Sequence, residues 1–209
     1  MKKLLFTILA SMALLSCGDD GSGSVSGPKP VSATIADDIA MTFAYDDKDR
    51  IQSVSAGGTT TTFTYNAESL VDKVITGDDF YQFTYDDDGK YTGIVNPNGD
   101  VGVLTHLGDD NYSSDGLVVN LESNGDWEEY QQFEFSYSNR KGAFAHVKSF
   151  NVLALLLIDF ETLYFASRKR RSAITSGNTV SSYTAVEGEK GLPASETVEG
   201  VTIQYVYSE

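Results

Sequence analysis

Few residues in this chain have the types and spacing that catalysis requires. Its two histidines, His106 and His146, are the side chains best suited to act as a general base near neutral pH. They lie forty residues apart, and no His-Glu-x-x-His, Gly-x-Ser-x-Gly or phosphate-binding glycine loop occurs. We therefore expect no enzyme activity. The alternative is a hydrolase whose site forms only in space, with one histidine beside a carboxylate and a Ser or Tyr hydroxyl.

Two acidic segments, 86–89 and 96–100, contain the oxygen ligands that calcium prefers next to a turn glycine. A helix-loop-helix calcium site also needs a distal bidentate Glu and flanking helices, which the sequence does not provide here. Hairpin turns already account for both segments, because Asp, Asn and Gly are turn formers. The sequence therefore predicts no metal site and no cofactor.

The single tryptophan, Trp127, lies close to Tyr130 in the sequence Trp-Glu-Glu-Tyr. Exposed aromatic rings beside carboxylates are common in sugar-binding sites, so this pair is the candidate ligand-binding site. A core aromatic beside a turn is the alternative, and the sequence favours it.

The first residues have the features of an export signal. A basic start, Met1-Lys2-Lys3, precedes a run of about 12 largely apolar residues, which is too short to cross a bilayer as a helix. The run ends in Leu-Leu-Ser before Cys17, which resembles the bacterial lipobox. That resemblance implies that residues 1–16 are removed and that a lipid is attached to Cys17.

Residues 17–32 are rich in Gly and Ser and are expected to form a flexible tether. The acidic pair Asp19-Asp20 resembles the signal that directs Bacteroidetes-type lipoproteins to the cell surface. We expect an exported protein anchored in the outer membrane, facing either the cell surface or the periplasm. Cys17 is the only cysteine, so the domain forms no internal disulfide.

The net charge limits the class of partner. The formal charge of the whole chain is −15, and removal of Lys2 and Lys3 with the signal makes the remainder more negative. Such a domain repels phosphate backbones, so we expect no nucleic-acid binding.

A repeat of 20 residues organises the first half of the domain. Segments 43–54, 63–74 and 83–94 each begin with Phe-x-Tyr followed by Asp or Asn, continue through a polar turn and end in a second apolar run. Phe and Tyr two residues apart face the same side of a strand. Each repeat is therefore a β-hairpin, and turns about every ten residues predict an antiparallel up-and-down meander.

One stretch departs from this pattern. Phe150–Ala166 is Leu-rich and nearly free of turn residues, which predicts a buried helix. Ser149 or Asn151 would cap its start, and Arg168–Arg171 would offset the dipole at its end. Two acidic residues within it leave no uncharged run long enough for a membrane span.

The resulting fold class is mainly β. We expect a single domain over residues 33–209, with roughly twelve strands in a meander. The meander forms a curved, open or nearly closed barrel-like sheet with one buried helix near residues 150–166.

The order of these parts resembles a known family. The Tyr-Asp units and the lipoprotein start are similar to a family of Bacteroidetes lipoproteins of unknown function with a porin-like fold. The resemblance covers about residues 40–207, including the closing Gly-Leu-Pro at 191–193 before the last strand. It implies a strongly curved sheet around the helix and no assigned activity. The hairpins resemble more weakly the Tyr-Asp (RHS-type) repeats of large secreted shell-forming proteins.

The sequence thus predicts a non-catalytic cell-envelope lipoprotein that contacts the membrane through Cys17. Its expected partner is a glycan, a peptide or a protein. The alternatives are the spatially assembled hydrolase and a structural subunit of a surface assembly.

Overall fold

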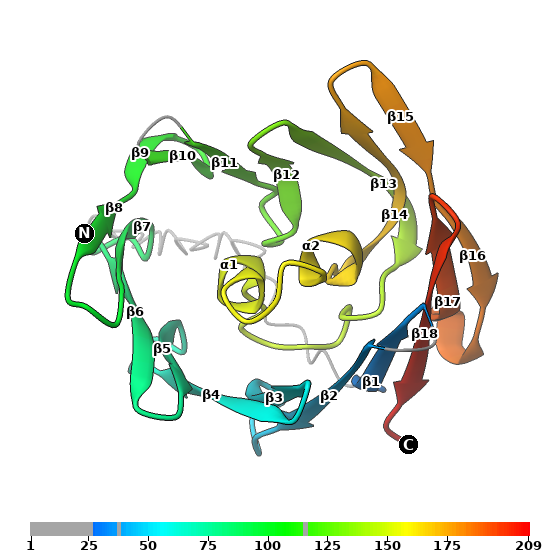
Figure 1. The fold of residues 1–209 in the computed structure, drawn as a ribbon, viewed down its shortest axis with the longest axis horizontal. Coiled ribbons are helices and arrows are strands. Elements are labelled where there is room, and N and C mark those ends of the chain that lie inside the picture. Colours follow the sequence, from blue (N-terminus) through cyan, green and yellow to red (C-terminus); the bar gives the residue numbers. More distant parts are fainter. Residues whose placement is uncertain (1–26, 37–38, 115–116) are drawn as a thin grey trace, which may run out of the picture.

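The computed structural model describes residues 27–36, 39–114 and 117–209, and these residues form two antiparallel sheets bent around two short helices (Figure 1). The signal segment, Cys17 and most of the expected tether lie outside the described residues. The mainly β meander is confirmed, and it is open rather than closed.

The larger sheet has eleven strands in the spatial order β16 (Thr184–Glu187), β17 (Pro193–Val198), β18 (Val201–Tyr207), β1 (Pro30–Ile35), β2 (Ile39–Tyr45), β3 (Ile51–Ala56), β4 (Thr59–Tyr65), β5 (Val71–Thr76), β6 (Asp79–Tyr85), β7 (Tyr91–Val95) and β8 (Val101–Val103). The smaller sheet has seven, in the order β15 (Thr179–Ser182), β14 (Lys169–Ser176), β13 (Phe133–Lys141), β12 (Trp127–Tyr130), β11 (Leu117–Leu121), β10 (Asn111–Ser114) and β9 (Thr105–Gly108).

The two ends of the described chain are joined in the larger sheet. β1 pairs with β18, and Ser208 N donates a 2.9 Å hydrogen bond to Lys29 O. Lys29 N in turn donates to Ser208 Oγ at 3.0 Å. Since β1 begins at Pro30, the sheet starts slightly before the domain boundary expected at residue 33.

The described part of the chain contains eighteen strands, more than the roughly twelve expected from turn spacing. The additional strands are short and their side chains are mostly exposed, as in β8, β9, β15 and β16. A strand that buries neither face has no apolar alternation, which is the signal used to find strands in a sequence.

The three predicted hairpins are confirmed, and their registers are equivalent. Phe43, Phe63 and Phe83 pair with Val54, Val74 and Ile94, and all three phenylalanines are buried.

The tyrosine two residues after each of these phenylalanines also forms a hydrogen bond. Tyr45, Tyr65 and Tyr85 each donate a 2.7 Å hydrogen bond to a main-chain carbonyl of an earlier strand: Pro30, Ile51 and Val71. The second and third repeats are thereby each bonded to the repeat before, and the first is bonded to β1.

The acidic or amide residue after each tyrosine closes the next turn. Asp46 Oδ1 accepts hydrogen bonds from the amides two and four residues later, at 3.0 and 2.9 Å. Asn66 and Asp86 make the same pair of contacts. The turn forms from local hydrogen bonds, which explains why it could be recognised from sequence.

The single helix expected near residues 150–166 is wrong. The structure contains two short helices instead, α1 (Val152–Leu156) and α2 (Thr162–Phe165). The interruption lies at Asp159, whose Oδ1 accepts from Glu161 N at 2.9 Å while its carbonyl accepts from Thr162 Oγ1 at 2.7 Å. Asp side chains that bond the backbone in this way compete with helix hydrogen bonds. The expected cap at Asn151 is confirmed, because its side chain accepts from Ala154 N.

The basic run Arg168–Arg171 does not offset a helix dipole. α2 ends at Phe165, and residues 169–171 begin β14. Arg170 and Arg171 are buried, and Arg171 donates to Ala166 O at 3.0 Å.

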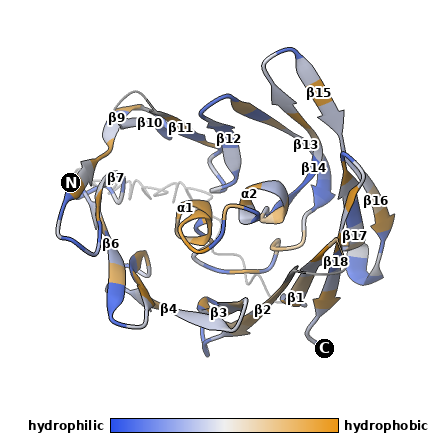
Figure 2. Cartoon of the chain, viewed as in Figure 1, coloured by the Kyte–Doolittle hydropathy of each residue, from blue (hydrophilic) through white to orange (hydrophobic). Residues whose placement is uncertain are grey.

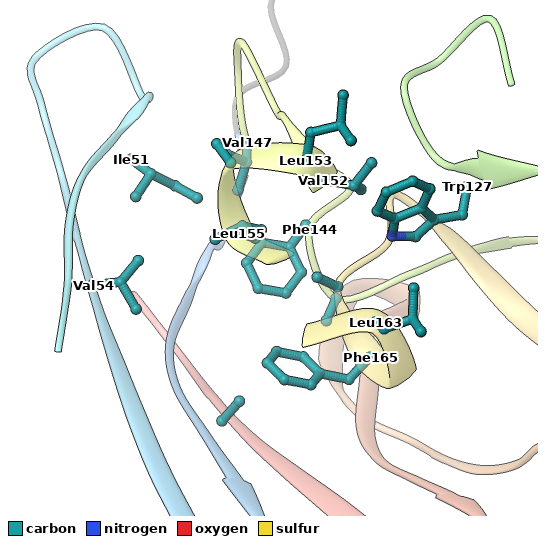
Figure 3. Packing of buried hydrophobic residues seen from close by; sticks show 14 of the residues in the cluster. Ile51, Val54, Trp127, Phe144, Val147, Val152, Leu153, Leu155, Leu163 and Phe165 are labelled. Atoms are coloured by element: carbon teal, nitrogen blue, oxygen red, sulfur yellow. The ribbon is translucent and has the colours of Figure 1, made fainter. Parts of the chain in front are cut away.

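Residues 142–168, between β13 and β14, fill the interior of the bent sheets. Phe144, Leu155 and Phe165 have no exposed surface, and Ile51 and Val54 of β3 face them (Figure 3). Figure 2 shows that α1 consists mainly of hydrophobic residues. Burial of each such side chain contributes about 1.5–3 kcal/mol, so this internal segment is the centre of the core.

Candidate functional site: a tyrosine-lined polar groove

A polar groove lies where the two sheets approach each other, between β7 of the larger sheet and β10 and β11 of the smaller one. Its walls are three turns: the turn after β6, the β9–β10 turn and the turn after β11. The inner part has a volume of about 170 Å³ and the outer part about 570 Å³. The inner part is lined by Leu70, Tyr85, Asp88, Gly89, Lys90, Tyr91, Asp110, Tyr112, Leu121, Glu122, Ser123 and Gly125. The outer part adds Asp109, Asn111 and Glu128.

Three tyrosine rings form the inner wall of this groove. The ring centroid of Tyr91 lies 5.1 Å from that of Tyr85 and 5.6 Å from that of Tyr112. The hydroxyl of Tyr85 is held by its hydrogen bond to Val71 O. Burial raises the pKa of Tyr85 and Tyr91, so both hydroxyls stay neutral at physiological pH. Tyr112 is 1% exposed and lies behind Tyr85 and Tyr91, which are half-buried and give the groove an aromatic, uncharged wall.

The rim of the groove is acidic. Lys90 Nζ lies 2.5 Å from Asp110 Oδ1, and this hydrogen bond raises the pKa of Lys90. Asp109 and Glu128 are exposed and form no ion pair within the residues that the structure describes. Carboxylates of this kind accept hydrogen bonds from hydroxyl or amine donors of a ligand.

The structure brings together the two residues that the sequence suggested for ligand binding, but it gives them different exposure. Trp127 is 1% exposed and packs its indole 5.1 Å from the Tyr130 ring, inside the core. Its carbonyl accepts from Tyr137 Oη at 2.7 Å. Tyr130 is half-buried. Their neighbour Glu128 does line the groove. This position of Trp127 favours the core role, and binding by the pair stays a prediction.

The tyrosines of the groove were not identified from the sequence as site residues. One signal was present: the third repeat has Tyr91 where the first two have Ile51 and Val71. A ring larger than the side chain that the repeat needs indicates an additional role or a change in packing. Only the fold brings Tyr112, from β10, beside Tyr91.

The two histidines lie in different surroundings. His106 is exposed, stacks 5.2 Å from Tyr112 and has Nε2 at 2.5 Å from the carbonyl of Asp109. His146 is buried, with Nδ1 at 3.1 Å from Pro28 O and Nε2 at 3.1 Å from Lys141 Nζ. None of these hydrogen bonds joins a histidine to a carboxylate or to a Ser or Tyr hydroxyl.

The contacts of His146 define its protonation. A carbonyl only accepts, so Nδ1 donates to Pro28 O and Nε2 accepts from the Lys141 ammonium. Burial lowers the pKa of His146, and the positive charges of Lys141, Lys29 and Lys190 lower it further. The ring also packs closely on Gly27, where an added Cβ would lie 2.3 Å from Nδ1. His146 thus holds the start of the described chain against the internal segment in its neutral form.

This arrangement predicts acid-sensitive stability. The pKa of His146 in the folded state is below its unfolded value of about 6.5. At pH values between these two pKa values, the unfolded chain binds a proton more readily than the folded chain does. The free energy of unfolding therefore decreases as pH falls through that window. His146→Gln keeps a donor for Pro28 and an acceptor for Lys141 and should lose this part of the pH dependence. Urea unfolding at several pH values between 5 and 8 measures it.

His106→Gln is the matched control, because that histidine is exposed. It should keep the pH dependence of the parent protein. An unchanged pH dependence in His146→Gln would contradict the assignment.

Among the described residues, no group of three or more His, Cys, Asp or Glu side chains is arranged to hold a metal ion. The acidic segment 86–89 is used in its turn, as Asp86 Oδ1 accepts from Asp88 N and Lys90 N. Within the same described ranges, neither helix has the length and apolar character needed to cross a membrane.

The fold and the groove define a class of protein: an open antiparallel meander built from Tyr-Asp hairpins around an internal apolar segment. Residues 29–113, which contain the three hairpins, match a family model described as the Teneurin YD-shell. The chain is also similar to a porin-like protein from Bacteroides uniformis ATCC 8492, known from a crystal structure. That pair has a TM-score of 0.44 and 13% identity, and the match covers 86% of this chain and 96% of the other. No curated protein matches this sequence.

Proposed function

We propose that this chain is a non-catalytic lipoprotein of the cell envelope, of the Bacteroidetes type with a porin-like fold, that binds a glycan in the polar groove. The observation that carries the proposal is the combination of the half-buried rings of Tyr85 and Tyr91 with a rim of hydrogen-bonding side chains. Sugar rings pack on aromatic faces, and their hydroxyls bond to carboxylate, amide and ammonium groups. The groove offers all four kinds of group in one place.

The negative charge of the rim determines which glycans can bind in the groove. Asp109, Asp110, Glu122 and Glu128 outnumber the cation Lys90 in the outer part. Uronic, sialic and sulfated sugars are anionic and would be repelled. The ligand class is therefore a neutral glycan or an amino sugar.

The contacts of the two histidines support the proposal of a non-catalytic protein. His146 is engaged with Pro28 and Lys141, and His106 with Asp109 O and the Tyr112 ring. Neither arrangement is a nucleophile paired with a base, which the hydrolase alternative requires.

A thermal-shift screen tests glycan binding. Neutral, amino and anionic oligosaccharides are added to the full chain carrying Cys17→Ala, which removes the site of lipid attachment. A ligand at a hundred times its dissociation constant adds about 2.7 kcal/mol to the free energy of unfolding, which raises the melting temperature by several degrees. We expect the shift for a neutral or amino sugar and none for an anionic one.

Two variants assign the shift to the groove. Glu128→Gln removes a rim carboxylate and should weaken binding roughly tenfold, as expected for a charged hydrogen bond. Asp87→Asn is the control, since Asp87 is exposed in a turn and does not line the groove. The absence of a thermal shift with every glycan tested would contradict the proposal. An equal loss of affinity in Glu128→Gln and Asp87→Asn would contradict it as well.

The anchor is tested separately in cells. Cys17→Ala should abolish labelling by a radioactive fatty acid and move the protein from the membrane fraction to the soluble fraction. Persistent labelling would show that Cys17 is not the site of lipid attachment.

A further inference from the structure

A second hollow, distinct from the polar groove, lies between α2, β1 and the β17–β18 hairpin. Its volume is about 220 Å³. It is lined by Ile35, Glu161, Tyr164, Val198, Glu199, Val201 and Ile203, and we call it the Glu161–Glu199 pocket. It shares no lining residue with the groove.

The floor of this pocket is apolar. Ile35, Val198 and Ile203 are at most 4% exposed and have no polar side-chain atoms. A polar group placed against them would lose its hydrogen bonds to water without replacement. The part of a ligand that enters deepest must therefore be an apolar group.

The mouth of the pocket is acidic. Glu199 is exposed and Glu161 is half-buried, so their carboxylates lie nearer to solvent than the floor does. Both are close enough to Tyr164 to raise its pKa, although burial is the larger cause. No basic residue lines the pocket, and neither carboxylate forms an ion pair within the described ranges. Two uncompensated carboxylates at the mouth attract a cation.

Glu199 occupies a backbone position that does not suit it. Glu199 and Gly200 form the two-residue loop of the β17–β18 hairpin, with φ of 52° and 80°. Such loops favour Gly, Asn or Asp at positive φ. The first loop residue is Gly57, Gly77 or Gly177 in three other two-residue hairpins, and it is Gln131, with φ of 55°, in the β12–β13 hairpin.

A glutamate held at positive φ costs stability, but other non-glycine residues such as Gln131 and Lys190 also have positive φ, so this conformation alone does not define a site. The orientation of its carboxylate is also defined, because Ser181 Oγ donates to Glu199 Oε1 at 2.5 Å. Glu161 and Glu199 both line the pocket, and their two negative charges are the features that favour a cation there.

We propose that the Glu161–Glu199 pocket binds the free N-terminus of a peptide whose first residue is apolar. The first side chain packs on Ile35, Val198 and Ile203, and the α-ammonium group lies between the two carboxylates. This order of groups, apolar inside and cationic at the mouth, is the order that the pocket presents. A lysine side chain has the reverse order, since its ammonium group is at the tip.

Methyl NMR spectroscopy of the full chain carrying Cys17→Ala tests this proposal with three matched probes. Leu-Gly-Gly has both features, N-acetyl-Leu-Gly-Gly lacks the charge, and Gly-Gly-Gly lacks the apolar side chain. We expect the methyl signals of Ile35, Val198, Val201 and Ile203 to shift with Leu-Gly-Gly and to stay unchanged with the other two. Equal binding of the acetylated peptide would overturn the proposal.

A fourth probe, isobutylamine, separates a peptide from a simple amine. It carries the same kind of apolar group and cation without a peptide chain. Binding at least tenfold weaker than that of Leu-Gly-Gly supports a peptide ligand. Equal affinity would overturn the peptide assignment and define the pocket as a site for alkylammonium ions.

The variant Glu199→Asn removes the carboxylate without introducing a residue that is unfavourable at this loop position. Asn suits the positive-φ position, so the variant should unfold at the same or a higher urea concentration than the parent. Its affinity for Leu-Gly-Gly should nevertheless fall about tenfold, because a charged contact is lost. Glu134→Gln, on an exposed strand residue, is the control and should bind normally. Unchanged affinity in Glu199→Asn would overturn the proposal, and this result is independent of glycan binding in the groove.

Discussion

Phe144→Ala lowers the free energy of unfolding by about 3–5 kcal/mol, the range for truncation of a fully buried phenylalanine. Phe144 has no exposed surface. Its ring lies 5.3 Å from Phe43 of β2, 5.3 Å from Phe150 and 6.2 Å from Phe165 of α2. It thus connects the internal segment to the larger sheet. The cavity left by alanine would remove contacts on all of these sides. Urea unfolding at neutral pH, followed by circular dichroism, measures the change.

Phe160→Ala is the control for Phe144→Ala. The Phe160 side chain is 48% exposed, and its ring contact is with Tyr164 at 6.1 Å. Its truncation should change the free energy of unfolding by about 1 kcal/mol or less. Similar losses for both variants would show that the internal segment is not the centre of the core.

Asp126→Ala is the second change with a large expected effect, a loss of about 2–5 kcal/mol. The Asp126 carboxylate is completely buried and accepts from Arg168 N at 2.6 Å and from Lys169 N at 2.8 Å. It also accepts from Asn124 Nδ2 at 2.9 Å. Alanine would leave two main-chain amides without acceptors, and each buried unsatisfied donor costs about 1–3 kcal/mol. The turn after β11 would also be detached from the start of β14.

Asp126→Asn tests how much a single acceptor contributes. Burial raises the pKa of Asp126, while the two amides and Asn124 oppose that shift. Arg168 N bonds to Oδ1 and Lys169 N to Oδ2, so an amide side chain keeps an acceptor for only one of them and turns its NH2 group toward the other donor. We therefore expect Asp126→Asn to lose less stability than Asp126→Ala in the same urea experiment, while remaining less stable than the parent protein. A variant as stable as the parent would show that the second hydrogen bond to β14 contributes nothing.

The groove and the pocket illustrate why sites on this fold are hard to identify from sequence. The groove combines Tyr91 with Asp110 and Glu128, and the pocket combines Ile35 with Glu161 and Glu199. Residues so far apart in the chain become neighbours only because the sheets bend around the internal segment. Trp127, in contrast, had a suggestive local sequence, and the fold places it in the core.

The sequence by itself determined the hairpin repeats of this protein. Their strands, turns and registers depend on hydrogen bonds between neighbouring residues, such as those of Asp46, and on alternation of apolar side chains such as Phe63. The tertiary structure decided the rest. Arg171 became buried because β14 passes beside the internal segment. The helix interruption at Asp159, in contrast, rests on local hydrogen bonds to residues 161 and 162, a signal that the surrounding apolar residues concealed. Short strands with both faces exposed, the open sheet and the two candidate sites depend on contacts between distant segments, which no local pattern records.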